Sequence, residues 1–274
     1  MNSNSILTEY YIENIKFQTS IEGKFKRGDD QVLFLDKAKN SLPNHLIKTG
    51  WTIEKIFTDL EFKTLKNSIR SVLLNIFNEY QIECRDLELE DYHNFINSYH
   101  YKVIKKTRLL TFNSLAINSK VFCDKISNII GRKVVKDNPL LKKDVVILRI
   151  NRPQSFDFNP LHRDGYLEIW ENTINVWIPI VGCNLKSSLP IIPGSHLINE
   201  KNIVKTNIRS AKLNKKTYNV PAIAKIEGGI KLIRPNPPKK HALIFSPFLI
   251  HGAAHNSNKN KTRISLEIRL FIDK

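Results

Sequence analysis

The sequence predicts a mainly β fold, a sandwich or jelly roll with helices packed against it. From about residue 144, short segments rich in branched and aromatic residues follow one another, and Pro and Gly separate them. Strands and helices do not alternate regularly along the sequence, so the sequence does not predict a parallel sheet. We expect one domain over residues 1–274, with a mainly helical N-terminal part (1–143), a jelly-roll core (144–274) and a basic insert at about 197–240.

Three helices are expected before the core. Thr58-Asp59-Leu60-Glu61 is a capping box, and the apolar residues after it recur at helical spacing as far as Tyr80. A shorter helix is expected around 89–99. Another covers about 115–130 and ends at Gly131. We assign these helices to packing and give them no chemistry.

Six strands are expected in the second half of the chain. Along the last of them polar and apolar residues alternate, so Arg263, Ser265, Glu267 and Arg269 share one face. We expect the apolar face to pack against the helices and the polar face to look into the jelly roll, with Arg149 as a further partner there. The expected strands are Val145–Ile150, Tyr166–Trp170, Ile174–Ile180, Val220–Lys225, His241–Phe245 and Arg263–Ile272.

Composition excludes several classes of protein. An apolar fraction of 41% excludes wholesale disorder. No run approaches the roughly 18–20 apolar residues of a membrane span, and the N-terminus lacks the pattern of a secretory signal. The three distant cysteines, Cys84, Cys123 and Cys183, exclude a disulfide framework and fit a reducing compartment. We therefore expect a cytoplasmic protein without a membrane partner.

Basic residues outnumber acidic ones, 43 to 26, which gives a net charge of +17. Residues 186–240 carry twelve Lys and Arg and two acids, a local net charge of +10. This segment is either a solvated surface or a funnel for an anionic substrate. Nucleic acid is a third possibility, which is weakened because Tyr218 is the only aromatic residue among these charges.

The chemistry is concentrated in His162-Arg163-Asp164. In an extended chain residues i and i+2 point to the same side, so the imidazole and the carboxylate can converge. His251-Gly252 follows 87 residues after Asp164, directly behind an apolar strand. Two His and one carboxylate form the facial triad suited to non-haem Fe(II). His255 competes with His251 as the distal ligand, and we prefer His251.

These motifs, taken together, resemble a known family. His162-Arg163-Asp164, the strand 175–180, the turn 189–196, His251-Gly252 and Arg263-Ile264-Ser265 occur in the order found in the phytanoyl-CoA dioxygenase-like branch of the Fe(II)/2-oxoglutarate oxygenases. The resemblance covers about residues 144–272. It implies a double-stranded β-helix core of the cupin type and a reaction that consumes 2-oxoglutarate and dioxygen and releases succinate and CO2.

The resemblance also implies roles for single residues. His162, Asp164 and His251 would bind Fe(II), and Arg263 with Ser265 would hold the distal carboxylate of 2-oxoglutarate. Halogenating relatives carry a small residue in place of Asp164. The carboxylate therefore favours hydroxylation, with desaturation and epimerisation left open.

Further candidates lie near these motifs. Asn175 is expected near 2-oxoglutarate, because a buried amide must form hydrogen bonds. Tyr166 and Trp177 either line the cavity or pack in the core. Arg152 and Gln154 precede His162 on an expected loop, where they contact either the substrate or only solvent. His196 either reaches the substrate or belongs to a turn.

We expect the substrate to be a small molecule, with a carboxylate, phosphate or larger anionic carrier that matches the basic segment. One alternative is a basic protein that binds or modifies nucleic acid, driven by the net charge. Another is a cupin-like metal protein without oxygenase activity. Arg263 with Ser265 disfavours the latter, because such a protein needs no anchor for an oxo acid.

Overall fold

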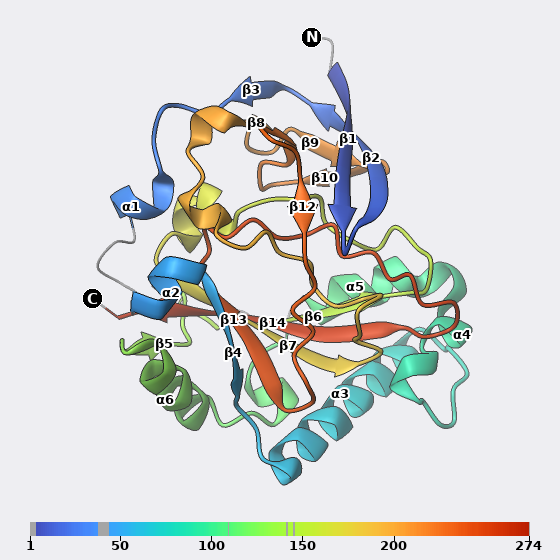
Figure 1. Ribbon diagram of the computed structural model, residues 1–274. Helices are drawn as coiled ribbons and strands as arrows, with labels where there is room; N and C mark the ends of the chain where they lie inside the picture. The colour runs from blue at the N-terminus through green and yellow to red at the C-terminus, as the bar shows by residue number, and fades with distance from the viewer. Residues whose placement is uncertain (1–3, 38–43, 109, 141, 145, 274) are drawn as a thin grey trace.

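The computed structural model describes residues 4–37, 44–108, 110–140, 142–144 and 146–273. At its centre lies an antiparallel sheet, here called the major sheet, in the order β4-β13-β7-β14-β5, with β6 also paired to β14 (Figure 1). Its strands are β4 (Trp51–Lys55), β5 (Val134–Val135), β6 (Val146–Asn151), β7 (Thr173–Val181), β13 (His241–Phe245) and β14 (Arg263–Ile272).

A second layer closes the core. Isolated bridges join His162 to His251, His251 to Ile191 and Ile191 to Ile233. Along the chain, the segment of His162 lies between β6 and β7, the segments of Ile191 and Ile233 both lie between β7 and β13, and the segment of His251 lies between β13 and β14. Eight segments divided between two layers in this order form a jelly roll, the double-stranded β-helix. The predicted mainly β fold with this core is confirmed.

The basic segment, residues 186–240, contains short β-strands as well as loops. It contributes five strands, three of which pair directly with N-terminal strands that the sequence analysis did not predict. β1 and β2 form a hairpin, β12 lies parallel to β1, and β8 pairs with β3 (Figure 1, top). The partners lie about 200 residues apart, which local patterns cannot reveal. These strands are β1 (Asn4–Ile12), β2 (Ile15–Gly23), β3 (Phe25–Arg27), β8 (Ile203–Thr206), β9 (Ala211–Leu213), β10 (Lys216–Tyr218), β11 (Ile223–Ile226) and β12 (Lys231–Leu232).

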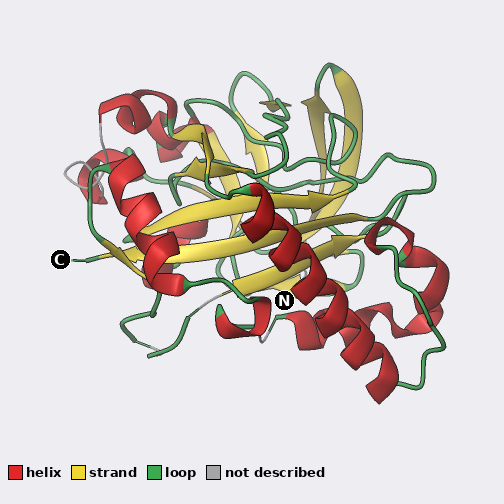
Figure 2. Ribbon diagram, turned by 90° about the horizontal axis from the view of Figure 1, so that it is seen from below, coloured by secondary structure: helices red, strands yellow, loops and turns green. Residues whose placement is uncertain are grey.

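Helices cover the outer face of the major sheet (Figure 2). α3 (Asp59–Glu79) begins with the predicted capping box at Thr58, and α6 (Ser119–Ile130) ends at Gly131 with φ +65°. Ile264, Leu266, Ile268 and Leu270 of β14 pack in one core with apolar residues of these helices, as predicted. The other α-helices are α1 (Leu33–Lys37), α2 (Asn44–Thr49), α4 (His93–Ile96) and α5 (His100–Thr107).

Two expected elements differ in the structure. Residues 166–170, predicted as a strand, belong to two short 3-10 helices, because the chain must turn back at Asp164 to enter β7. The helix expected at 89–99 is divided into three short helices. Val145 lies outside the described residues. The 3-10 helices are η1 (Leu89–Asp91), η2 (Asn97–Tyr99), η3 (Asn113–Leu115), η4 (Asp164–Tyr166), η5 (Glu168–Trp170), η6 (Ser195–Leu197) and η7 (Glu200–Asn202).

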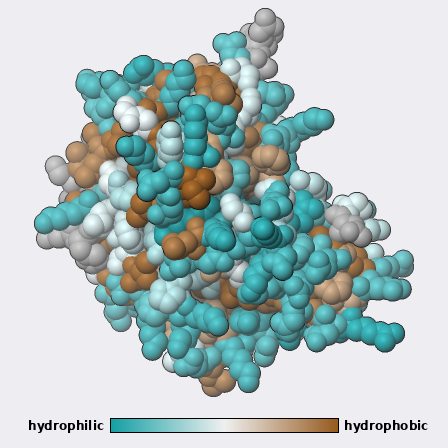
Figure 3. All heavy atoms as spheres, turned by 45° about the vertical axis from the view of Figure 1, so that its right-hand side comes forward, coloured by the Kyte–Doolittle hydropathy of each residue, from teal (hydrophilic) through white to brown (hydrophobic). Residues whose placement is uncertain are grey.

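The face shown in Figure 3 is mainly hydrophilic, with hydrophobic side chains in small groups. Among the described helices, none combines the length and the apolar character needed to span a bilayer.

Candidate metal centre

Two histidines lie opposite each other in the inner layer of the jelly roll. His162 and His251 exchange both backbone hydrogen bonds, at 2.9 and 3.0 Å, so their side chains leave the same face. Asp164 follows two residues after His162. Its carboxylate oxygens lie 3.6 Å from His162 Nε2 and 3.9 Å from His251 Nε2. The three predicted ligands thus converge, with one potential ligand atom from each within 4.8 Å of the others.

Hydrogen bonds prepare both imidazoles to bind a metal. His162 Nδ1 donates to the carbonyl of Pro160 at 2.7 Å, and His251 Nδ1 donates to the carbonyl of Leu249 at 2.9 Å. A carbonyl oxygen can only accept, so the proton of each neutral ring is on Nδ1 and the lone pair is on Nε2. Burial, and next the neighbouring His162, lower the pKa of His251 to about 4. The ring is therefore neutral near pH 7, as a metal ligand must be.

Gly252 permits the close pairing of the two histidine segments. Its backbone φ is +120°, a value that residues other than glycine rarely adopt. A Cβ atom at this position would lie 2.4 Å from the carbonyl oxygen of Pro160, which accepts the proton of His162. The His-Gly sequence is therefore a steric requirement of this site.

Asp164 is held by two partners that the sequence analysis did not assign to it. Arg269 Nε donates to Oδ2 and Arg269 Nη2 to Oδ1, both at 3.0 Å, and Asn175 Nδ2 donates to Oδ2 at 2.9 Å. Burial alone would raise the pKa of Asp164, but the Arg269 charge, together with the hydrogen bond and charge of His162 and the charge of His251, outweighs burial and holds this pKa well below its usual range. Oδ1 carries fewer hydrogen bonds and is the better placed oxygen for a metal. Asn175 thus orients the candidate ligand Asp164, and its expected place near 2-oxoglutarate stays a prediction.

Arg163 points away from the metal-ligand candidates, and its hydrogen bonds hold the segment 162–164 from the opposite side. Its guanidinium donates to Glu200 Oε1 and to the carbonyl of Ser195, both at 2.6 Å, and all three residues are fully buried. Lys205 also pairs with Glu200 and lies over the ring of Tyr166. Tyr166, expected either to line the cavity or to pack in the core, directs its hydroxyl at Glu200. No sequence pattern indicated Glu200, which lies 37 residues from Arg163.

Arg263 and Ser265 lie on the inner face of β14, as predicted. Arg263 is 2% exposed, and its Nη1 donates to Ser265 Oγ at 2.6 Å. Its Nε has no partner, and no described carboxylate forms an ion pair with it. Burial lowers the pKa of this guanidinium, although an arginine stays charged at neutral pH. A β-bulge beside Pro179 shifts the register of β7 at this point.

A cavity of about 30 Å³, room for one or two waters, joins Arg263 to both histidines. Arg149 and Glu267 also line it, and Arg149 Nε donates to Glu267 Oε2 at 2.8 Å. The predicted partnership of Arg149 with the polar face of β14 is confirmed. The other residues that line the cavity are Asn151, Asp157, Phe158, Asn159, Leu189, Gly252 and Ala254.

The remaining substrate candidates do not line this cavity. The Arg152 guanidinium forms two hydrogen bonds with Asp157, and Gln154 is exposed. His196 Nε2 bonds to the carbonyl of Ile47 at 2.8 Å. Trp177 packs with Phe158, Leu189 and other apolar side chains, and its indole nitrogen has no hydrogen-bond partner.

The alternative ligand His255 lies apart from the cluster. Its Nε2 bonds to the Tyr10 hydroxyl at 2.7 Å, and its ring stacks on Phe17. It is also absent from the group of potential ligand atoms found among the described residues. The preference for His251 therefore agrees with the geometry.

Comparison with known proteins gives low similarity. No family model and no curated protein matches the sequence. AviO1 from Streptomyces viridochromogenes Tue57 is 13% identical with a TM-score of 0.46, over 82% of this chain and 91% of that one. EctD from S. alaskensis, in a structure with 2-oxoglutarate and 5-hydroxyectoine, is 12% identical with a TM-score of 0.46, over 91% and 84%.

A third similar structure is the non-heme alpha ketoglutarate dependent carbocyclase SnoK from nogalamycin biosynthesis. It is 10% identical, with a TM-score of 0.43 and 86% of both chains covered.

Proposed function

We propose that this protein is a non-haem Fe(II)- and 2-oxoglutarate-dependent dioxygenase that hydroxylates a small anionic molecule. The observation that supports this most strongly is Arg263, a buried guanidinium without a carboxylate partner in the described part of the chain. An uncompensated buried charge costs several kcal/mol. An anionic co-substrate would offset this cost, and the cavity beside Arg263 is also lined by two of the metal-ligand candidates, His162 and His251.

Each residue has a physical task in this proposal. His162, Asp164 and His251 would hold one face of the metal and leave the opposite positions open. Fe(II) with 2-oxoglutarate and dioxygen supplies the oxidation of an unactivated C–H bond, with release of succinate and CO2. Arg263 and Ser265 bind the distal carboxylate and so fix the distance between the oxo acid and the metal. The apolar side chains of Phe158 and Leu189 limit the access of water to the cavity.

An anionic substrate is favoured by cations beside the cavity. Arg149 lines it but is already paired with Glu267, so the additional positive charge comes from Arg108, which lies close enough to Arg149 for repulsion to contribute, after burial, to the lowered pKa of Arg108. Lys216, from the basic segment, reaches the carbonyl of Phe156 at 3.5 Å, next to two residues of the cavity wall. These groups would attract a carboxylate or phosphate to the metal site.

The first experiment is an anaerobic titration of metal-free protein with Fe(II) and 2-oxoglutarate. We expect a charge-transfer absorption band in the wild type that is absent in Asp164→Ala and His251→Ala. Arg263→Leu should raise the Kd for 2-oxoglutarate by about 100-fold, because a hydrogen bond to a charged group contributes about 1.5–3 kcal/mol. It should leave Fe(II) affinity within about twofold, because Arg263 contacts no metal ligand.

Arg263→Lys is the matched control, since it retains the charge without the planar fork and should recover part of the affinity. Fe(II) binding without the absorption band would contradict the proposal and leave a metal-binding jelly roll without oxygenase chemistry. A second experiment tests the charge of the substrate. Candidate substrates that carry a carboxylate or a phosphate should stimulate the consumption of 2-oxoglutarate more than their neutral esters do. Equal stimulation by esters would contradict the anionic substrate.

A further inference from the structure

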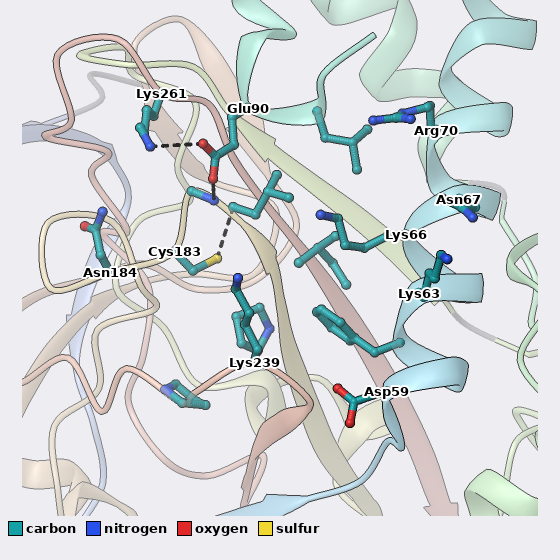
Figure 4. A pocket seen from close by; sticks show the side chains of 17 residues that line it. Asp59, Lys63, Lys66, Asn67, Arg70, Glu90, Cys183, Asn184, Lys239 and Lys261 are labelled. Carbon is teal, nitrogen blue, oxygen red and sulfur yellow. Dashed lines mark hydrogen bonds and ion pairs between the residues drawn. The ribbon is translucent and has the colours of Figure 1, made fainter.

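A second hollow lies outside the metal site. It is a groove of about 560 Å³ between α3 and the end of β7, and it shares no lining residue with the metal-site cavity (Figure 4). We call it the α3 groove. This volume falls within the range that small-molecule sites usually have.

Part of the floor of the α3 groove is apolar, formed by the edges of side chains that are otherwise mostly buried. Phe62 and Leu89 come from the helical side, and Ile180 and Val181 come from β7. Pro237 adds a rigid apolar surface beside them. Such a surface can bury the apolar body of a ligand, at about 25 cal/mol for each Å² removed from water.

Charged side chains surround this apolar surface, five basic and two acidic. Both acids already have basic partners. Glu90 pairs with Lys261 at 3.1 Å and accepts the N–H of Gly182, and Asp59 pairs with Lys240 at 3.0 Å. Arg70 pairs with Glu88 at 2.6 Å. No ion pair with any described carboxylate involves the remaining lysines, Lys63, Lys66 and Lys239.

The basic residues of α3 share one side of the helix. Lys63, Lys66 and Arg70 are spaced three and four residues apart, so they are neighbours on the surface. Like charges at this spacing lower the stability of a helix by about 0.2–0.5 kcal/mol per pair. In Figure 4 the side chains of Lys66 and Lys239 extend into the groove from its two walls. The arrangement concentrates positive charge where an anion would fit.

We propose that the α3 groove binds a small molecule in which a phosphate group is joined to an apolar body. Ammonium groups of Lys63, Lys66 and Lys239 would bind the phosphate as point charges. The apolar body would lie on Phe62 and Ile180. The shared chemistry, a phosphate monoester with an apolar substituent, fits both a nucleotide and an aryl or alkyl phosphate.

Calorimetric titration of the full chain tests the proposal. The probes are naphthyl phosphate, adenosine monophosphate, inorganic phosphate and uncharged naphthol, all at 0.15 M salt, where long-range attraction is screened beyond about 8 Å. We expect at least one of the two esters to bind at least tenfold more tightly than inorganic phosphate and naphthol. The ester that binds more tightly identifies the apolar body.

Variants locate the binding. Lys66→Ala with Lys239→Ala should weaken ester binding at least tenfold, whereas Lys225→Ala, an exposed lysine of β11, should leave it unchanged. His251→Ala, which removes a metal-ligand candidate but keeps the buried Asp164–Arg269 pair, should bind the ester as the wild type does, so failure of the metal-site proposal is distinguished from failure here. Equal losses in the double lysine variant and in Lys225→Ala, no preference for the esters, or loss of binding in His251→Ala would each overturn the proposal.

Discussion

Arg269→Leu tests whether the candidate iron ligand depends on its buried ion pair. The guanidinium forms two hydrogen bonds of 3.0 Å with Asp164, and both side chains are less than 10% exposed. Removal of one partner from a buried pair costs about 3–5 kcal/mol, because the other charge remains uncompensated. Asn175 still donates to Asp164, so we expect a loss in the free energy of unfolding near the lower limit, about 3 kcal/mol.

Urea unfolding of the metal-free protein, followed by circular dichroism, measures this loss. The matched control is Arg70→Leu, which removes an arginine from the exposed pair with Glu88 and should cost less than about 1 kcal/mol. The double variant Asp164→Leu/Arg269→Leu should be more stable than Arg269→Leu alone, because it no longer buries an unpaired carboxylate.

Metal binding shows whether Arg269 holds the Asp164 carboxylate or only packs against it. Without the competing guanidinium, Asp164 should bind Mn(II), a stand-in for Fe(II) in aerobic solution, more tightly. The Tm increase caused by excess Mn(II) should therefore be larger in Arg269→Leu than in the wild type. A stability loss below about 1 kcal/mol, or an equal Tm increase in both proteins, would refute this account of Asp164.

Three further predictions follow from local geometry. Thr58→Ala should lower the free energy of unfolding by about 1 kcal/mol through loss of the α3 cap, whereas Thr64→Ala, within the helix, should not; urea unfolding compares them. Gly252→Ala should abolish Mn(II) binding measured by calorimetry, because its Cβ would displace the histidine segments, whereas Gly131→Ala, whose Cβ meets no atom within 4 Å, should retain it. Glu200→Gln should cost about 3 kcal/mol or more in unfolding experiments, because it leaves two buried cations without their carboxylate; an unchanged urea midpoint would contradict this.

Local sequence determined much of this protein. The capping box at Thr58 predicted the start of α3, and Gly131 predicted the end of α6. Alternation along β14 predicted which side chains face the core and which face the cavity. The spacing of His162 and Asp164 on one extended segment predicted that they converge. These signals are readable because each depends on residues only a few positions apart.

Tertiary structure decided the remaining features. The hairpin β1–β2 forms one sheet with β9, β10 and β12 of the basic segment, and β3 forms another with β8 and β11, only because strands far apart in the chain meet. Arg269 was visible on the polar face of β14, but only the packing of β14 against η4 assigned it to Asp164. Likewise, only the folded structure shows that Arg152 pairs with Asp157, and that Arg163 and Tyr166 form hydrogen bonds with Glu200. A buried charge requires a partner, but the partner can come from any part of the chain, and only the folded structure identifies it.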